Sequence, residues 1–118
     1  MWMLLVIGLG GAVGAIARYS LGLLFVGQTF PWGTLTINVA GSFIFGALWS
    51  LCGEQDWFLS WGRGFLLVGI LGGFTTFSAF SLETLLLINN GRIAVATTYV
   101  MASVGLCLLS VWLGSRIG

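Results

Sequence analysis

The residues with the most chemical potential are at positions 72–81, which read Gly-Gly-Phe-Thr-Thr-Phe-Ser-Ala-Phe-Ser. They lie within an apolar run from about residue 57 to residue 88, which is long enough to cross a bilayer. Two glycines followed by two threonines are poor helix formers, so this stretch predicts a membrane helix that breaks and restarts. Backbone carbonyl and N–H groups freed by such a break can form an ion site where protein or a water-filled cavity surrounds them. A glycine seam for close helix packing is an equal alternative on residue types alone.

Three further polar residues fall inside apolar segments: Arg18, Asn38 and Glu83. The amide of Asn38 can donate two hydrogen bonds to an anion, or it can bond to a neighbouring helix, which residue types alone favour. Arg18 is either a functional charge or a side chain that snorkels to the interface, and the sequence leaves both open. Glu83 is the only carboxylate within a span, so one chain offers no intramembrane carboxylate pair for acid–base catalysis.

The composition indicates an integral membrane protein and argues against an enzyme. Of 118 residues, 58% are hydrophobic and only 6% are charged, whereas soluble domains carry about a quarter charged residues. Histidine and lysine are absent, which excludes Ser-His-Asp catalysis, Cys-His catalysis and histidine-bound metals. Cys52 and Cys107 stand far apart without metal-ligand spacing, so we interpret both as neutral packing residues. The formal charge of +1 offers no basic surface for nucleic acid.

Four continuous apolar segments predict an all-α membrane protein, with one transmembrane domain over residues 1–118. The expected spans cover about residues 3–26, 32–51, 62–88 and 93–113. Continuous rather than alternating hydrophobicity disfavours a β-barrel, and the first segment lacks the basic start of a cleaved signal peptide. Pro31 suits the opening turn of the second helix, and Gly10 and Gly14 have the spacing of a helix-packing seam.

Helical spacing gathers polar and aromatic residues of the last two spans on particular faces. Two such faces are expected: Phe77, Phe80 and Glu83 after the break, and Tyr99, Ser103 and Cys107 on the fourth span. Aromatic pairs at this spacing are commonly packing residues, so the pattern alone does not assign them to a pore.

In three blocks the sequence resembles the Fluc or CrcB family of small fluoride-specific ion channels. The blocks are residues 10–19 (GGAVGAIARY), 34–43 (TLTINVAGSF) and 72–80 (GGFTTFSAF), and the third is highly specific. The resemblance implies a four-helix subunit that inserts in both orientations and pairs as an antiparallel homodimer. It also implies passive export of fluoride from the cytoplasm through a channel that is embedded in the lipid of the plasma (inner) membrane.

The resemblance assigns roles to individual residues. A structural Na+, which is not transported, would lie at the dimer centre on the main-chain carbonyls of Gly72 and Thr75, a donor set that suits a hard cation. Arg18 is expected to be a structural charge. The expected ion pathway offers an amide, hydroxyls, ring edges and one carboxylate, from Asn38, Thr76, Phe77, Phe80, Ser81, Glu83, Tyr99 and Ser103. Weak, repeated contacts of this kind favour conduction over tight binding.

The arginines independently favour dual topology. With four spans, both termini and the loop between the second and third spans face one side, which carries Arg63 and Arg116. The opposite side carries Arg92, and Arg18 lies toward that end of its helix. Two arginines at each end give no positive-inside bias, so both orientations are expected.

Two other functions compete with a fluoride channel. A proton-coupled exporter like those of the small multidrug resistance family depends on a carboxylate in the first helix, where this chain has Arg18 and no acid. A non-transporting membrane assembly protein, held together by glycine seams, leaves Asn38 and the Gly-Thr stretch unexplained. Flux in liposomes separates the three functions: passive fluoride leak, proton-coupled cation uptake, or neither.

Overall fold

The computed structural model, which describes residues 1–118, contains helices and no strands. Four long apolar segments, each long enough to cross a membrane, cover Trp2–Phe25, Trp32–Cys52, Phe58–Asn89 and Ile93–Ser115. This confirms the prediction of an all-α membrane protein with four apolar helices.

Seven elements make up these segments. The first segment contains α1 (Trp2–Gly22) and the short 3₁₀ helix η1 (Leu23–Phe25), and the second is α2 (Trp32–Cys52). The third contains the π-helix η2 (Phe58–Leu71), the single turn α3 (Gly72–Phe74) and α4 (Phe77–Asn89), and the fourth is α5 (Ile93–Ser115). The third segment begins at Phe58 rather than near residue 62, because the apolar run already starts there.

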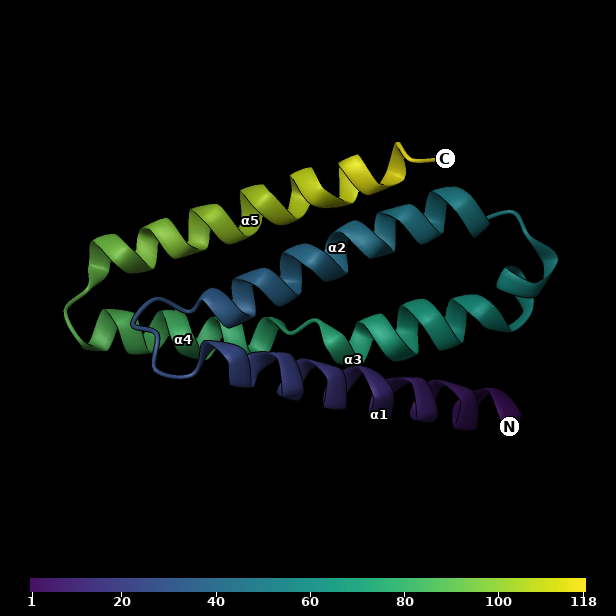
Figure 1. Ribbon diagram of the computed structural model, residues 1–118, viewed down its shortest axis with the longest axis horizontal. Coiled ribbons are helices and arrows are strands. Elements are labelled where there is room, and N and C mark those ends of the chain that lie inside the picture. The colour runs from purple at the N-terminus through teal and green to yellow at the C-terminus, as the bar shows by residue number, and fades with distance from the viewer.

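The helices form a flat, elongated bundle of 50 × 29 × 21 Å, with α2 and α5 on one side and α1 and the third segment on the other (Figure 1). Both termini lie at the end of the bundle that also holds the loop between α2 and η2 (Figure 1). The opposite end holds the other two loops, including the turn at Gly91, whose φ of 76° suits glycine.

Glycines allow close approach within both helix pairs. Where α2 packs against α5, a Cβ at Gly46 or Gly114 would collide with carbonyl oxygens of the opposite helix. Where α1 packs against η2, a Cβ at Gly10 would lie 2.7 Å from the carbonyl oxygen of Phe65, and one at Gly14 would collide with the same helix. The predicted packing seam at Gly10 and Gly14 is confirmed.

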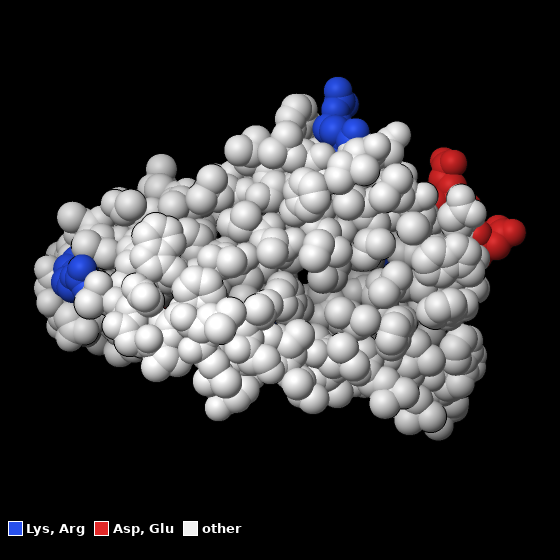
Figure 2. Space-filling view, viewed as in Figure 1, with Lys and Arg blue, Asp and Glu red and all other residues white.

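Most large apolar side chains face outward. Only 19 of the 118 residues are buried, and the exposed ones include Leu5 and Leu9 on α1 and Met101 and Leu108 on α5. Lipid tails are as apolar as these side chains, so such a surface suits a bilayer rather than water. The face in Figure 2 is mostly white, with blue atoms at the left end and blue and red atoms toward the right.

The third segment is interrupted at Thr75 and Thr76. Helix α3 ends at Phe74, Thr75 (ψ 155°) and Thr76 (φ −150°, ψ 119°) have extended backbones, and α4 begins at Phe77. Gly72 and Gly73 remain helical, so the two threonines form the interruption and the two glycines do not. β-Branched residues such as threonine suit extended backbone.

Candidate functional site

Asn38 on α2 is hydrogen-bonded to both backbone groups of Thr76. Its Oδ1 accepts from the Thr76 N–H at 2.9 Å, and its Nδ2 donates to the Thr76 carbonyl at 3.0 Å. A backbone residue that leaves the helix loses its helical partners, and a side-chain amide carries the one acceptor and the donors needed to replace them. One N–H of Asn38 therefore serves the interruption, and one remains for another acceptor.

The interruption also frees main-chain carbonyls, among them those of Gly72 and Thr75. In a continuous helix the Thr76 N–H would bond to Gly72, but here it donates to Asn38. The Ala79 N–H would likewise bond to Thr75, but here it donates to the Thr76 side-chain oxygen at 3.1 Å, which caps the start of α4. No hydrogen bond within the chain reaches the carbonyl of Gly72 or Thr75. The family resemblance assigned these two oxygens to a structural Na+, which stays a prediction.

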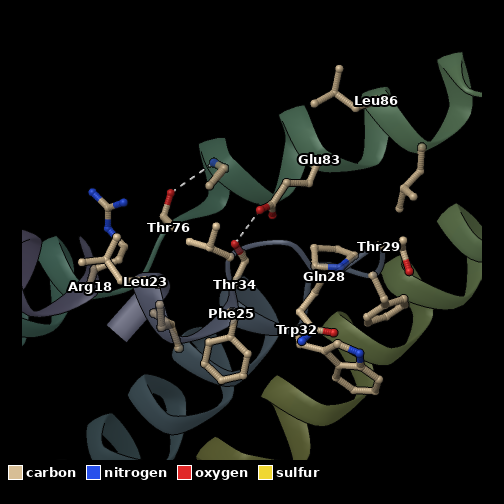
Figure 3. A pocket seen from close by; sticks show the side chains of 18 of the residues that line it. Arg18, Leu23, Phe25, Gln28, Thr29, Trp32, Thr34, Thr76, Glu83 and Leu86 are labelled. Carbon is tan, nitrogen blue, oxygen red and sulfur yellow. Dashed lines mark hydrogen bonds between the residues drawn. The ribbon is translucent and has the colours of Figure 1, made fainter. Parts of the chain in front are cut away.

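Arg18 binds one of the two carbonyls that lie between those of Gly72 and Thr75 in the sequence. Its Nε donates to the Gly73 carbonyl at 3.2 Å, and its side chain is partly buried. Intramembrane arginines require such carbonyl partners. Together with Arg92, Arg18 also lines a cavity of about 520 Å³ at the end of the bundle opposite the two termini, which we call the end cavity. Figure 3 shows this end cavity.

Glu83 links three helices through its carboxylate. Oε2 accepts a hydrogen bond from the Thr34 hydroxyl on α2, and Oε1 accepts one from the Tyr99 hydroxyl on α5, both at 2.9 Å. Figure 3 shows the bond between Glu83 and Thr34, which both line the end cavity. Tyr99 is fully buried, so its hydroxyl donates to this carboxylate instead of to water.

Aromatic rings form a column beside the carboxylate. Phe77 and Phe80 on α4 have ring centroids 5.3 Å apart, and Phe80 lies 5.1 Å from Tyr99. Phe30, from the first loop, meets Tyr99 edge to face at 5.5 Å. Most of Phe77 is exposed (76%), whereas Phe80 is buried.

A groove of about 430 Å³, which we call the α2–α5 groove, runs beside the interruption. Its lining includes Thr75 and five of the eight predicted pathway residues, namely Asn38, Thr76, Phe77, Phe80 and Ser103. The Oγ of Ser103 is buried and has no hydrogen-bond partner. Thr76 lines both this groove and the end cavity, so the interruption borders both spaces.

Comparison with known proteins supplies the family. A family model described as "CrcB-like protein, Camphor Resistance (CrcB)" matches residues 5–115. The chain belongs to the CrcB family. The blocks at residues 10–19, 34–43 and 72–80 all lie inside the matched region.

Relatives of this CrcB-family chain align along nearly its whole length. A protein of Opitutus terrae is 48% identical over 97% of this chain and 90% of its own, and bears the name "Fluoride-specific ion channel FluC". Proteins with the same name from Rhizobium meliloti and Rhodospirillum rubrum are 44% and 45% identical, over 94% and 93% of this chain and 91% and 89% of their own. The family is one of ion channels, which confirms the prediction that the chain is not an enzyme.

Three predicted pathway residues do not line the groove of this CrcB-family protein. Glu83 lines the end cavity, and Tyr99 is fully buried and lines neither space. Ser81 is exposed, lines neither space, and donates its hydroxyl to the Phe77 carbonyl of its own helix at 3.0 Å. Sequence reasoning also missed Thr34, the α2 partner of Glu83, because nothing in the spacing links residues so far apart in the chain.

Proposed function

We propose that this protein is a fluoride-selective passive channel that lowers fluoride in the cytoplasm. The α2–α5 groove is the observation that carries the proposal, because it gathers an amide, hydroxyls and two phenylalanine rings beside an interrupted membrane helix. Relatives named as fluoride-specific ion channels, at 44–48% identity, support the choice of ion.

The groove suits an anion that must shed water without becoming trapped. Fluoride is small and strongly hydrated, so donors must replace its water. The remaining N–H of Asn38 and the unpartnered hydroxyl of Ser103 are such donors, and Phe77 and Phe80 add the positive edges of their rings. No arginine lines the groove, so each contact is weak, as conduction requires.

The end cavity would deliver or release the ion. Arg18, Arg92 and one acid, Glu83, line it, so basic groups outnumber the acid and favour a higher local concentration of anions. A passive channel lets fluoride follow its gradient and the membrane potential. A potential that is negative inside drives an anion outward by about 2.3 kcal/mol per 100 mV, so a channel in the plasma (inner) membrane would export fluoride without a pump.

Na+ fits the freed carbonyls as a structural ion that is not transported. Neutral carbonyl oxygens are the ligands of a hard monovalent cation, and those of Gly72 and Thr75 lack hydrogen-bond donors within the chain. Two such oxygens from each of two chains would give four ligands. The ion would supply a positive charge where the two interrupted helices meet.

An antiparallel homodimer of dual topology completes this proposal. Phe77 is largely exposed beside the groove, which a second copy would cover. A two-fold axis in the membrane plane would bring the interruptions of two opposed chains together at mid-depth. By the same symmetry the dimer would have two equivalent pathways.

Efflux from liposomes tests this function directly. Purified protein is reconstituted into vesicles loaded with fluoride or chloride, and a potassium ionophore balances the charge. We expect fluoride to leave without a proton gradient while chloride stays inside. Chloride efflux at a rate comparable to that of fluoride contradicts the proposed selectivity, and proton-coupled cation uptake would instead indicate a multidrug-type exporter.

A further inference from the structure

The chain has two free cysteines in contrasting surroundings. Cys107 on α5 is partly buried and lines the α2–α5 groove. Cys52, the last residue of α2, packs against the apolar cluster of Phe58, Leu67 and Leu71 and lines neither the groove nor the end cavity. One thiol therefore faces the proposed pathway, and the other offers a matched control.

Ser103 gives independent evidence that this part of the groove accommodates another group. It precedes Cys107 by four residues, which places the two on one face of α5. Buried helical hydroxyls commonly donate to the carbonyl four residues earlier, as Thr84 does to Phe80 at 2.8 Å. Ser103 makes no such bond, although it is only 7% exposed. A buried hydroxyl without a partner is costly, so a visiting ion, water or polar group beside Cys107 stabilises it.

We propose that Cys107 is a covalent modification site inside the ion pathway, and that a small group attached to its Sγ blocks permeation. The proposal rests on the function proposed above, because it takes the groove as the path of the ion. A group on Sγ would lie in the space that Ser103 and Phe80 also line. It would thereby occupy the groove and cover the unpartnered hydroxyl, whereas the unmodified thiol leaves both open.

The matching reagents are small disulfides and thiosulfonates. The proton of the Cys107 thiol passes to water, and the thiolate attacks the reagent's sulfur. A new S–S bond forms as the reagent's own S–S bond breaks, and the departing thiolate or sulfinate takes the electron pair. The sulfur of the reagent is the oxidant, so no further oxidant is consumed. A dithiol reverses the reaction and should restore the pathway.

The test compares the wild type with Cys52→Ser and Cys107→Ser, using methyl methanethiosulfonate as the probe. This reagent is small and neutral, so it can enter an apolar groove. Peptide masses measured after proteolysis report which cysteine carries the S-methyl group. Fluoride efflux is measured before treatment, after treatment and after a dithiol, and each variant is compared with its own untreated rate.

In the wild type and in Cys52→Ser we expect labelling of Cys107 and a fall in flux of at least about ten-fold, equivalent to ~1.4 kcal/mol of barrier. The dithiol should restore the flux, and treatment should leave the flux of Cys107→Ser unchanged. Undiminished flux in a protein labelled at Cys107 overturns this inference alone, as does an equal block in Cys107→Ser or labelling confined to Cys52. Untreated protein that passes no fluoride overturns the proposed function and this inference together.

Discussion

The side-chain amide of Asn38 replaces the helical hydrogen-bond partners of the Thr76 backbone. The amide oxygen and nitrogen of one side chain meet the N–H and the carbonyl of one residue, at 2.9 and 3.0 Å, across 38 positions of sequence. Two consequences follow from this pairing. It fixes α2 to the interruption of the third segment, and it withdraws the Thr76 N–H from Gly72, which leaves the Gly72 carbonyl without that donor.

We expect Asn38→Asp to abolish fluoride flux. A carboxylate cannot donate to the Thr76 carbonyl, and its charge would repel both that oxygen and an approaching anion. Each buried hydrogen bond left unmade costs about 1–3 kcal/mol, so the thermal stability should fall as well. Thr36→Ala, at an exposed position of the same helix, is the control and should conduct normally. Wild-type flux in Asn38→Asp contradicts the assigned pathway.

We expect Phe80→Ile to reduce fluoride flux by about ten-fold or more, which is ~1.4 kcal/mol of barrier. The ring of Phe80 is buried within 5.3 Å of Phe77 and 5.1 Å of Tyr99, and isoleucine keeps much of its volume but offers no ring edge. Phe43→Ile serves as the control, because Phe43 is partly exposed and lines neither the groove nor the end cavity. Equal rates in the two variants would argue that the ring edge has no part in conduction.

The helices were predictable from the sequence, whereas the contacts between them were not. Apolar runs place the four spans to within a few residues, and Gly10 and Gly14 mark a packing seam. Helical spacing also places Ser103 and Cys107 together on one side of α5, where both line the groove. These features depend on residues close in the chain, which is why a pattern reveals them.

The roles of the polar residues depend on neighbours far away in the chain. Residue types favoured a hydrogen bond from Asn38 to a neighbouring helix. The observed partner is the backbone of Thr76, whose N–H and carbonyl are available because Thr76 leaves the helix. Glu83 lies 49 residues from Thr34, so their hydrogen bond has no local signature. Ser81 illustrates the opposite error, because a hydroxyl at a suitable spacing can be satisfied by its own helix.

The two donors to Glu83 should be coupled in stability. Thr34→Val and Tyr99→Phe each remove one hydrogen bond to a carboxylate, worth about 1.5–3 kcal/mol, while the other donor remains. The double variant leaves the carboxylate without either donor, so its loss should exceed the sum of the two singles by roughly 0.5–3 kcal/mol. Unfolding followed by tryptophan fluorescence in detergent measures all three. In a Glu83→Gln background the excess should shrink, and strict additivity with the native carboxylate would contradict a shared acceptor.

Removing sodium should destabilise the protein. If Na+ binds only the folded dimer, each ten-fold fall in its concentration above the dissociation constant removes about 1.4 kcal/mol of stability. Melting in sodium and in N-methylglucamine measures this loss. Thr75→Ser should change flux and sodium dependence little, because the expected ligand is the carbonyl of Thr75 and its side chain already bonds to Leu71. Identical melting in the two salts would contradict the sodium site.

Finally, added positive charge at the C-terminus should abolish function by forcing one orientation. Arg18 and Arg92 both line the end cavity. Both termini lie at the opposite end of the bundle (Figure 1). Arg116 lies at the C-terminus and Arg63 near the start of η2, so each end carries two arginines and neither end is retained in the cytoplasm by charge. Two or three C-terminal lysines break that balance.

A variant locked in one orientation by C-terminal lysines should insert fully but conduct no fluoride, because an antiparallel dimer needs both orientations. A second variant, with the lysines placed in the loop that contains Gly91, should insert the opposite way and be equally inactive alone. Co-expression of the two should restore flux, since opposed copies can then pair. Accessibility labelling of a terminal tag reports the orientation of each variant. Normal fluoride conduction by either locked variant alone would rule out the antiparallel dimer, since every copy would then face the same way.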